Sequence, residues 1–287
     1  MCDDFIHPGL VEDHRLSRRN FGLLTAAVAG APASAMAQSH VVETDVTVKT
    51  PDGTCDAALF HPAGQGTHAA VLIWPDIMGL RPAFRDMGRR LAGLGYVVLV
   101  PNPFYRSAKA PVIGENFDFN NQEQRQRLFG YRAAMTDSGV DNDAQAYLTF
   151  LDAQPQTNKS KKAGVQGYCM GGSLSFRTAA AVPGRIAAVG SFHGGNGLVT
   201  KDANSPHLLI AKTNASYLVC QAQNDDMQQP QMKEDLNAAF TAANKPATVE
   251  VYAANHGWCV KGGAVYNEAE AERAWAALSK LYQTQLA

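Results

Sequence analysis

Residues 164–173 read GVQGYCMGGS, and this short stretch decides the fold. A small apolar run leads to Gly167, a cysteine follows at position 169, and Gly171 stands two residues further on. The run predicts a buried strand over residues 163–167, and residues 171–181 predict a helix. A turn this tight between a strand and a helix places the thiol beyond the end of the strand, where it is accessible to a substrate.

The rest of the chain repeats this alternation of short apolar segments and helical segments. It predicts a mostly parallel sheet with helices on both faces. The turn at residues 51–53, Pro-Asp-Gly, predicts an antiparallel hairpin at one edge of the sheet. We expect strands over residues 41–49, 55–60, 69–74, 96–100, 163–167, 186–192, 217–221 and 248–252, and helices over 82–94, 122–134, 137–152, 171–181, 231–243 and 268–285.

The first 37 residues have a different character from the rest. Arg18 and Arg19 precede a charge-free apolar run at residues 22–30, and residues 35–37, Ala-Met-Ala, form a signal-peptidase pattern. The paired arginines resemble a twin-arginine export signal, and the run is too short to cross a bilayer. We therefore expect residues 1–37 to be a cleaved signal, and residues 38–287 to be one domain that is periplasmic or secreted and not bound to a membrane.

Composition narrows the class of protein. Of the 287 residues, 46% are hydrophobic and 18% are charged, which is typical of a globular enzyme. A formal net charge of −1 argues against a nucleic-acid partner, which would require clustered basic side chains. The cysteines form no CxxC pair, so we expect no metal and no cofactor. We also expect a monomer; the pairing of Cys55, Cys220 and Cys259 stays open.

The spacing Gly-x-Cys-x-Gly matches the nucleophile elbow of α/β hydrolases, with cysteine in place of serine. Side chains at positions 167 and 171 would collide with the strained turn. The helix that begins at the thiol favours the thiolate form. Cys169 is therefore the expected nucleophile of an α/β-hydrolase fold.

A thiol nucleophile needs a base and an acid that orients the base. In this fold they follow in the chain order nucleophile, acid, histidine. His256 follows the strand over residues 248–252 and is the expected base. Asp225 or Asp226 is the acid, with Asp225 preferred because it lies nearer the preceding strand. His193 precedes both candidates, so we place it in the pocket wall.

The negative oxygen of an ester intermediate needs two backbone donors. The N–H of Met170, directly after the nucleophile, is the first candidate. The N–H of Ile77, in the loop after the strand over residues 69–74, is the second. Asp76 in the same loop either contacts the thiol or substrate or caps the next helix.

Together these residues resemble the dienelactone hydrolase family. The resemblance rests on WPDIMGL at residues 74–80, GYCMGG at 167–172, the turn that holds Asp225, and HGW at 256–258. It implies a Cys–Asp–His triad that opens a lactone or ester through a thioester, carried here by Cys169, Asp225 and His256. Trp258, inside the last motif, is expected in the pocket wall.

The resemblance also has implications for the substrate. Members of the family have an acidic residue, usually Glu, against the resting thiol, and here Asp76 takes that place. They bind a substrate carboxylate with arginines, one of them a few residues after the catalytic histidine, where this chain has Val260. Arg81 or Arg106 could serve from other loops.

The first hypothesis is thus a thiol-dependent hydrolase of small esters or lactones. A second is a non-catalytic protein that binds a small ligand on a hydrolase scaffold. A third is a thiol redox protein in which Cys169 forms a disulfide with Cys220 or Cys259.

Overall fold

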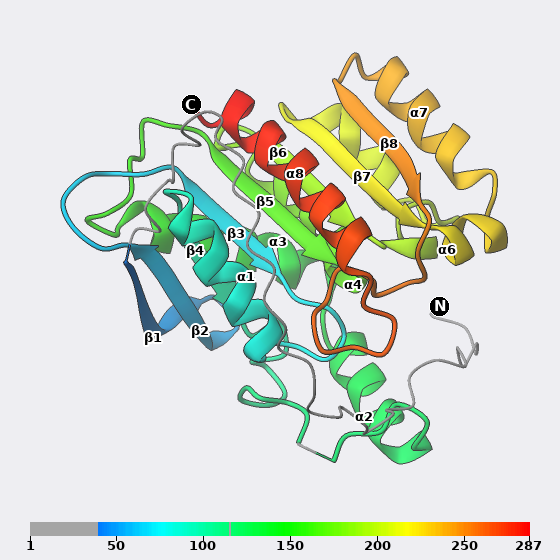
Figure 1. The fold of residues 1–287 in the computed structure, drawn as a ribbon, viewed down its shortest axis with the longest axis horizontal. Helices are drawn as coiled ribbons and strands as arrows, with labels where there is room; N and C mark the ends of the chain where they lie inside the picture. Colours follow the sequence, from blue (N-terminus) through cyan, green and yellow to red (C-terminus); the bar gives the residue numbers. More distant parts are fainter. Residues whose placement is uncertain (1–39, 115) are drawn as a thin grey trace, which may run out of the picture.

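A computed structural model describes residues 40–114 and 116–287. They form an eight-stranded sheet in the order β1-β2-β4-β3-β5-β6-β7-β8, with helices on both faces (Figure 1). The expected fold class is therefore confirmed. The strands are β1 (Val41–Thr50), β2 (Gly53–Pro62), β3 (Ala70–Trp74), β4 (Val97–Pro101), β5 (Ala163–Tyr168), β6 (Ile186–Phe192), β7 (Ser216–Ala222) and β8 (Ala247–Tyr252).

Strand direction divides the sheet into two parts. β1 pairs with β2 and β2 pairs with β4 in antiparallel register, which gives the expected hairpin at one edge. From β4 to β8 every neighbouring pair is parallel. The carboxyl ends of six strands therefore meet along one side of the sheet, and side chains that follow these ends lie close together.

The helices cover the two faces of the sheet. In Figure 1, α1 and α8 lie on the near face and α3 and α4 on the far face. α8 places Ala274, Leu278 and Tyr282, spaced four residues apart, in the near-face core. The helices are α1 (Pro82–Gly93), α2 (Gln122–Ala133), α3 (Asp137–Asp152), α4 (Met170–Ala181), α5 (Pro206–Leu209), α6 (Gln223–Gln228), α7 (Met232–Ala242) and α8 (Glu268–Gln285).

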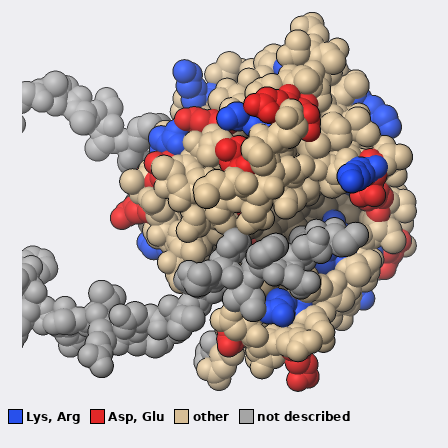
Figure 2. Space-filling view, turned by 90° about the vertical axis from the view of Figure 1, so that its right-hand side faces the viewer, with Lys and Arg blue, Asp and Glu red and all other residues tan. Residues whose placement is uncertain are grey.

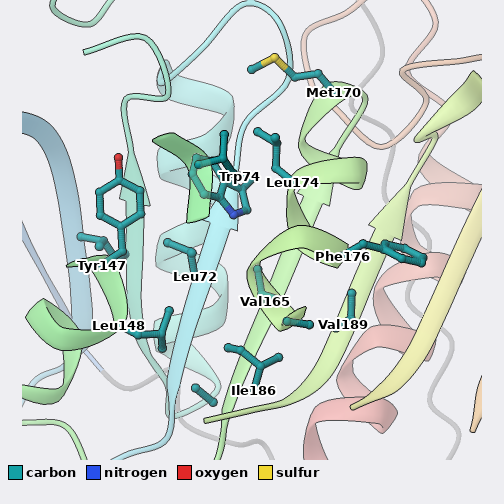
Figure 3. Packing of buried hydrophobic residues seen from close by; sticks show 14 of the residues in the cluster. Leu72, Trp74, Tyr147, Leu148, Val165, Met170, Leu174, Phe176, Ile186 and Val189 are labelled. Atoms are coloured by element: carbon teal, nitrogen blue, oxygen red, sulfur yellow. The ribbon is translucent and has the colours of Figure 1, made fainter. Parts of the chain in front are cut away.

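The far-face core fixes the helix that follows Cys169. Leu72 and Trp74 on β3 point into it, while Val71 and Ile73 on the same strand point into the near-face core. Figure 3 shows Trp74 beside Leu174 of α4. The indole Nε1 of Trp74 also donates a hydrogen bond to Thr178 Oγ1 at 2.8 Å. α4 is thus held against the neighbouring strand at the end where the thiol emerges.

The sequence did not predict two short helices, α5 and α6. α6 has the sequence QNDDMQ, in which no apolar periodicity exists, and we had expected a turn there. The proposed export signal at residues 1–37 lies outside the described residues. Within them, no helix has the length and apolar character needed to cross a membrane. On the face in Figure 2, acidic and basic side chains are interspersed.

Candidate active site

The turn after β5 is the tight elbow expected from the sequence. Cys169 lies between β5 and α4 with φ 54° and ψ −120°, a left-handed conformation that few non-glycine residues adopt. A Cβ on Gly167 would lie 1.8 Å from the carbonyl oxygen of Gly171. A Cβ on Gly171 would lie 2.4 Å from the carbonyl oxygen of Trp74. Both glycines are therefore required by close backbone contacts.

His256 and Asp225 meet at the same side of the sheet. Asp225 lies in α6, directly after β7, and His256 lies in the loop after β8. Nδ1 of His256 lies 2.8 Å from Oδ2 of Asp225, and the Asp225 side chain is almost fully buried. Asp225, and not Asp226, is therefore the acid that contacts this histidine.

The structure contains a contact that we did not anticipate. The backbone N–H of His256 donates to Oδ1 of Asn224 at 2.8 Å. Asn224 directly precedes the acid, so two consecutive residues of α6 hold one histidine by its backbone and by its ring. A carboxamide beside the acid was the only sign of this in the sequence.

The electrostatics of His256 are set by its two neighbours. Burial lowers the pKa of the imidazole, but the negative charge of Cys169 and hydrogen bonds with Asp225 and Cys169 raise this pKa well above its ordinary value. The thiol and the carboxylate thus both favour the protonated form of the imidazole.

The two amides expected to bind an oxyanion lie at the start of α4 and in the loop after β3. Met170 is the first residue of α4, so its N–H has no acceptor within the helix. In the other loop, Met78 N–H donates to Asp76 Oδ1 and Gly79 N–H donates to Asp76 O, both at 2.9 Å. Neither bond uses the Ile77 amide. The carbonyl of Trp74, at the end of β3, lies close to Gly171, which brings this loop close to the elbow.

Asp76 forms an ion pair with Arg81 that the sequence did not predict. Its carboxylate accepts two hydrogen bonds from Arg81, at 2.6 and 2.7 Å, besides the one from Met78. Among the described residues, no hydrogen bond joins it to the thiol of Cys169. It does not cap α1 either, because that helix begins after Arg81 and has no side-chain cap. The expected role of Asp76 at the thiol or substrate therefore remains a prediction.

The second arginine considered for a substrate carboxylate is also paired internally. Arg106 donates to both oxygens of Asp143, at 2.7 and 2.9 Å, and to Asp52 at 2.6 Å. Tyr105 donates to Asp143 at 2.7 Å. Nearby, Tyr147 donates to the sulfur of Cys55 at 3.2 Å. We call Cys55, Tyr105, Arg106, Asp143 and Tyr147 the edge network, because they lie beside the antiparallel edge of the sheet.

His193 and Trp258, placed in the pocket wall by the sequence, pack against each other, and His193 also packs against His256. The ring centroid of His193 is 4.9 Å from that of His256 and 5.2 Å from that of Trp258. Trp258 is fully buried and stacks on Tyr252 at 5.3 Å. His193 thus packs against the ring of His256 and Trp258 against that of His193, and contact of either with a substrate stays a prediction.

The remaining cysteines form no disulfide in the described residues. Cys55, Cys169, Cys220 and Cys259 are all free thiols. Burial raises the pKa of Cys55 and of Cys220 to about 12, so neither forms a thiolate readily. The part of the chain that the structure describes also contains no group of three or more His, Cys, Asp or Glu side chains placed to hold a metal ion.

Comparison with known proteins agrees with this geometry. The model of the dienelactone hydrolase family matches residues 55–286. A carboxymethylenebutenolidase of Rhodococcus opacus is 24% identical over 71% of this chain and 75% of its own. That of a Pseudomonas species is 32% identical over 45% of this chain and 51% of its own.

Solved structures share the fold. The crystal structure of a dienelactone hydrolase-like promiscuous phosphotriesterase from metagenomic libraries has a TM-score of 0.69 and 21% identity, over 86% of this chain and 99% of its own. Because the family model covers most of the chain, the elbow and the histidine loop both lie within the match. The chain therefore belongs to the dienelactone hydrolase family, and it is a hydrolase that acts on ester or lactone bonds.

Proposed function

We propose that the protein hydrolyses small esters or lactones by nucleophilic catalysis, with Cys169 as nucleophile, His256 as acid–base and Asp225 as the orienting acid. One observation carries the proposal. A histidine that follows β8 has its Nδ1 2.8 Å from a buried carboxylate, and the elbow thiol is among the groups that raise the pKa of this histidine. This is the relation between nucleophile, base and orienting group that acyl transfer requires.

In the first half of the reaction the thiolate of Cys169 attacks the carbonyl carbon. The carbonyl oxygen becomes negative and accepts hydrogen bonds from the amides of Met170 and Ile77. When the intermediate collapses, the C–O bond to the alcohol breaks and a thioester forms on Cys169. The imidazolium of His256 donates its proton to the departing alkoxide.

In the second half, the now neutral His256 removes a proton from water. The hydroxide attacks the thioester, the same amides bind the new oxyanion, and the C–S bond breaks. The acid leaves, and the thiolate and imidazolium are restored. Asp225 holds the ring of His256 with Nε2 toward the reacting atoms and stabilises its positive charge in both halves.

The test is to trap the thioester. Rapid quenching of the enzyme with an aryl acetate, followed by peptide mass spectrometry, should find an acetyl group on the peptide that contains Cys169. Hydroxylamine should remove it, as it does with thioesters. A Cys169→Ala variant that still hydrolyses the ester at the wild-type rate contradicts the proposal.

The preferred substrate is proposed to be uncharged near the scissile bond. Arg81 is bound to Asp76 and Arg106 to Asp143, while Val260 is buried and apolar. A carboxylate on the substrate would have to break one of these ion pairs to reach an arginine. We expect kcat/KM for a plain lactone to exceed that for the same lactone with a carboxylate. The reverse preference would show that one of these pairs opens.

The location of the protein is part of the proposal. Arg18, Arg19 and the sequence Ala35-Met36-Ala37 support export through the twin-arginine route and cleavage after residue 37. Fractionation of bacterial cells that make the full chain should recover the shortened protein in the periplasm. Replacing both arginines with lysine should retain the uncut chain in the cytoplasm.

A further inference from the structure

His193 occupies an unusual position at the end of β6. It directly follows Phe192, the last residue of the strand, and its backbone N–H donates to the carbonyl of Cys220 on β7 at 2.8 Å. Its φ is +39°, a left-handed value that is uncommon outside glycine and asparagine. The side chain is almost completely buried. A polar ring held in a strained backbone at the catalytic side of the sheet suggests a specific task.

The first contact of this ring is with the elbow itself. Nδ1 of His193 accepts a hydrogen bond from the backbone N–H of Cys169 at 3.1 Å. The same N–H points at the carbonyl of Phe192 at 3.0 Å, so one donor is shared between a strand neighbour and the imidazole. Nδ1 can accept only when it carries no proton. The proton of the neutral ring is therefore on Nε2, which is buried and has no partner among the described residues.

The second contact of the ring is with the base. The edge-to-face packing of His193 on His256, with centroids 4.9 Å apart, leaves one imidazole between the backbone of the nucleophile and the ring of the base. The ring of Trp258 also packs edge-to-face against His193, with centroids 5.2 Å apart. A shift of the His193 ring would therefore change the distance and orientation between the thiol of Cys169 and the ring of His256.

The electrostatic surroundings of His193 also favour its neutral form. Burial, and then the proximity of His256, lower the pKa of His193 well below its ordinary value, while the pKa of His256 is raised. The titratable groups around the His193 ring are Cys169 from the elbow, Tyr168 at the end of β5, and His256 from the loop after β8. A proton on Nδ1 of His193 would oppose the amide of Cys169 and repel the imidazolium of His256.

From these contacts we infer that His193 is a positioning residue of the active site: its neutral ring fixes the amide of Cys169 through Nδ1 and supports the ring of His256 by edge contact. It thereby sets the distance and orientation between nucleophile and base. The inference rests on the proposed function of these two residues. His193 itself touches no reacting atom.

Two variants test the inference. His193→Gly accepts the left-handed backbone but removes both the acceptor and the ring. His193→Asn also accepts this backbone, and its Oδ1 can take the place of Nδ1 as acceptor. We expect kcat to fall about a hundredfold in the glycine variant with KM changed by less than about threefold, and the asparagine variant to recover about tenfold of that loss.

The pH dependence of Cys169 alkylation distinguishes the two possible roles of His193. A residue that only stabilised the fold would not change it. In His193→Gly, the pH at which iodoacetamide labelling of Cys169 reaches half its maximal rate should shift, and His193→Asn should shift it less. Val189→Ala, a cavity-forming change in the buried interior of β6, is the matched control. It should lower the midpoint of urea unfolding without moving this pH or kcat. A folded His193→Gly variant with the kcat and labelling profile of the wild type overturns the inference.

A measurement on the unmodified enzyme avoids the risk that a variant fails to fold. Nitrogen-15 NMR of labelled histidine should show His193 neutral and protonated on Nε2 throughout the range from about pH 6 to 8. A proton on Nδ1 at pH 7 also overturns the inference. If Cys169→Ala stays active, the proposed function is lost, whereas these NMR signals still report the bond to the Cys169 amide.

Discussion

Cys169 and Cys55 have the same side chain in two regions of this molecule, and the surroundings give them opposite properties. Cys169 is half-buried in a strained turn, and it is among the groups that raise the pKa of His256. Cys55 is fully buried in β2, where burial raises its pKa to about 12; the charges of Asp56 and Asp143 add to this effect, and the hydrogen bond from Tyr147 opposes it. The surroundings of a cysteine in the fold therefore determine how readily its thiol forms a thiolate.

The charged groups of the two regions differ in the same way. At the elbow, Nδ1 of His256 lies 2.8 Å from Oδ2 of Asp225, and the thiol and this carboxylate both raise the pKa of the imidazole. In the edge network, Asp143 is surrounded by Arg106 and Tyr105, so every one of its partners donates to it. In the proposed reaction a group of the first arrangement changes its protonation, whereas the second arrangement only joins elements of the fold.

Removal of each thiol in turn should give the largest difference between the two cysteines. Cys169→Ala should lower kcat for an aryl ester by about 10⁴-fold or more, because no nucleophile remains. Cys55→Ala should leave kcat within about twofold, but it deprives the hydroxyl of Tyr147 of its acceptor and should cost about 1–3 kcal/mol of unfolding free energy. Steady-state kinetics and urea unfolding measure the two effects. A folded Cys55→Ala enzyme as inactive as Cys169→Ala would end the comparison.

Labelling of the unmodified protein gives the next largest effect. At pH 7 iodoacetamide should label Cys169 at least about a hundredfold faster than Cys55, because only a thiolate reacts and the pKa of Cys55 is about 12. Because Cys55 is fully buried, its labelling should require opening of the protein and should stay slow from pH 7 to 10 as long as the protein is folded. Peptide mass spectrometry after timed quenching measures both rates, with a urea-unfolded sample as control. Equal labelling in the folded protein would contradict the assignment.

Asp225 and Asp226 are neighbours in the sequence, but their substitution should have different effects on activity. Asp225→Asn should lower kcat by about 10²–10⁴-fold, since an amide cannot stabilise the imidazolium of His256, while Asp226→Asn should stay within about threefold. The carboxylate of Asp225 raises the pKa of His256, so its loss should lower that pKa. The decline of activity at alkaline pH, where His256 loses its proton, should therefore begin at lower pH in Asp225→Asn. A pH–rate profile for both variants tests this, and identical profiles would exclude Asp225 from the proposed role.

Much of the fold could be predicted because hydrophobic periodicity depends on local sequence. α3, α8 and β6 have the predicted bounds, and the other predicted elements differ by only a few residues. α6 could not be predicted in this way. It has six mostly polar residues and depends on tertiary contacts, among them the hydrogen bond between Asn224 and the backbone of His256.

Some features of the candidate site could likewise be predicted from the sequence, and others could not. The elbow is a local motif, so the glycines around Cys169 identified it. Chain order indicated His256, and nearness to a strand end favoured Asp225 over Asp226. The partners of Asp76 and the bond from the Cys169 amide to His193 could not be predicted, since Arg81 and β6 approach through the three-dimensional fold. Side-chain pairing across loops has no periodic signal in the sequence.

The smallest expected effect on activity lies in the edge network. Arg106→Met leaves the buried carboxylate of Asp143 with Tyr105 as a remaining donor and should cost about 3 kcal/mol of unfolding free energy. Asp52→Asn removes the partly exposed partner of the same arginine and should cost less than about 1 kcal/mol. Both variants should keep kcat within about threefold, because neither touches the elbow.

The pH dependence of Arg106→Met separates an unpaired charge from lost packing. A buried carboxylate without its arginine has a raised pKa and takes up a proton more readily, so the folded variant binds more protons than its unfolded chain as the pH falls. The stability deficit relative to the wild type should therefore shrink between pH 7 and pH 5, as measured by urea unfolding at each pH. A deficit that is constant with pH would mean that the arginine acts here through its packing, and the contrast drawn between a proton-transferring region and a charge-paired region would lose its second half.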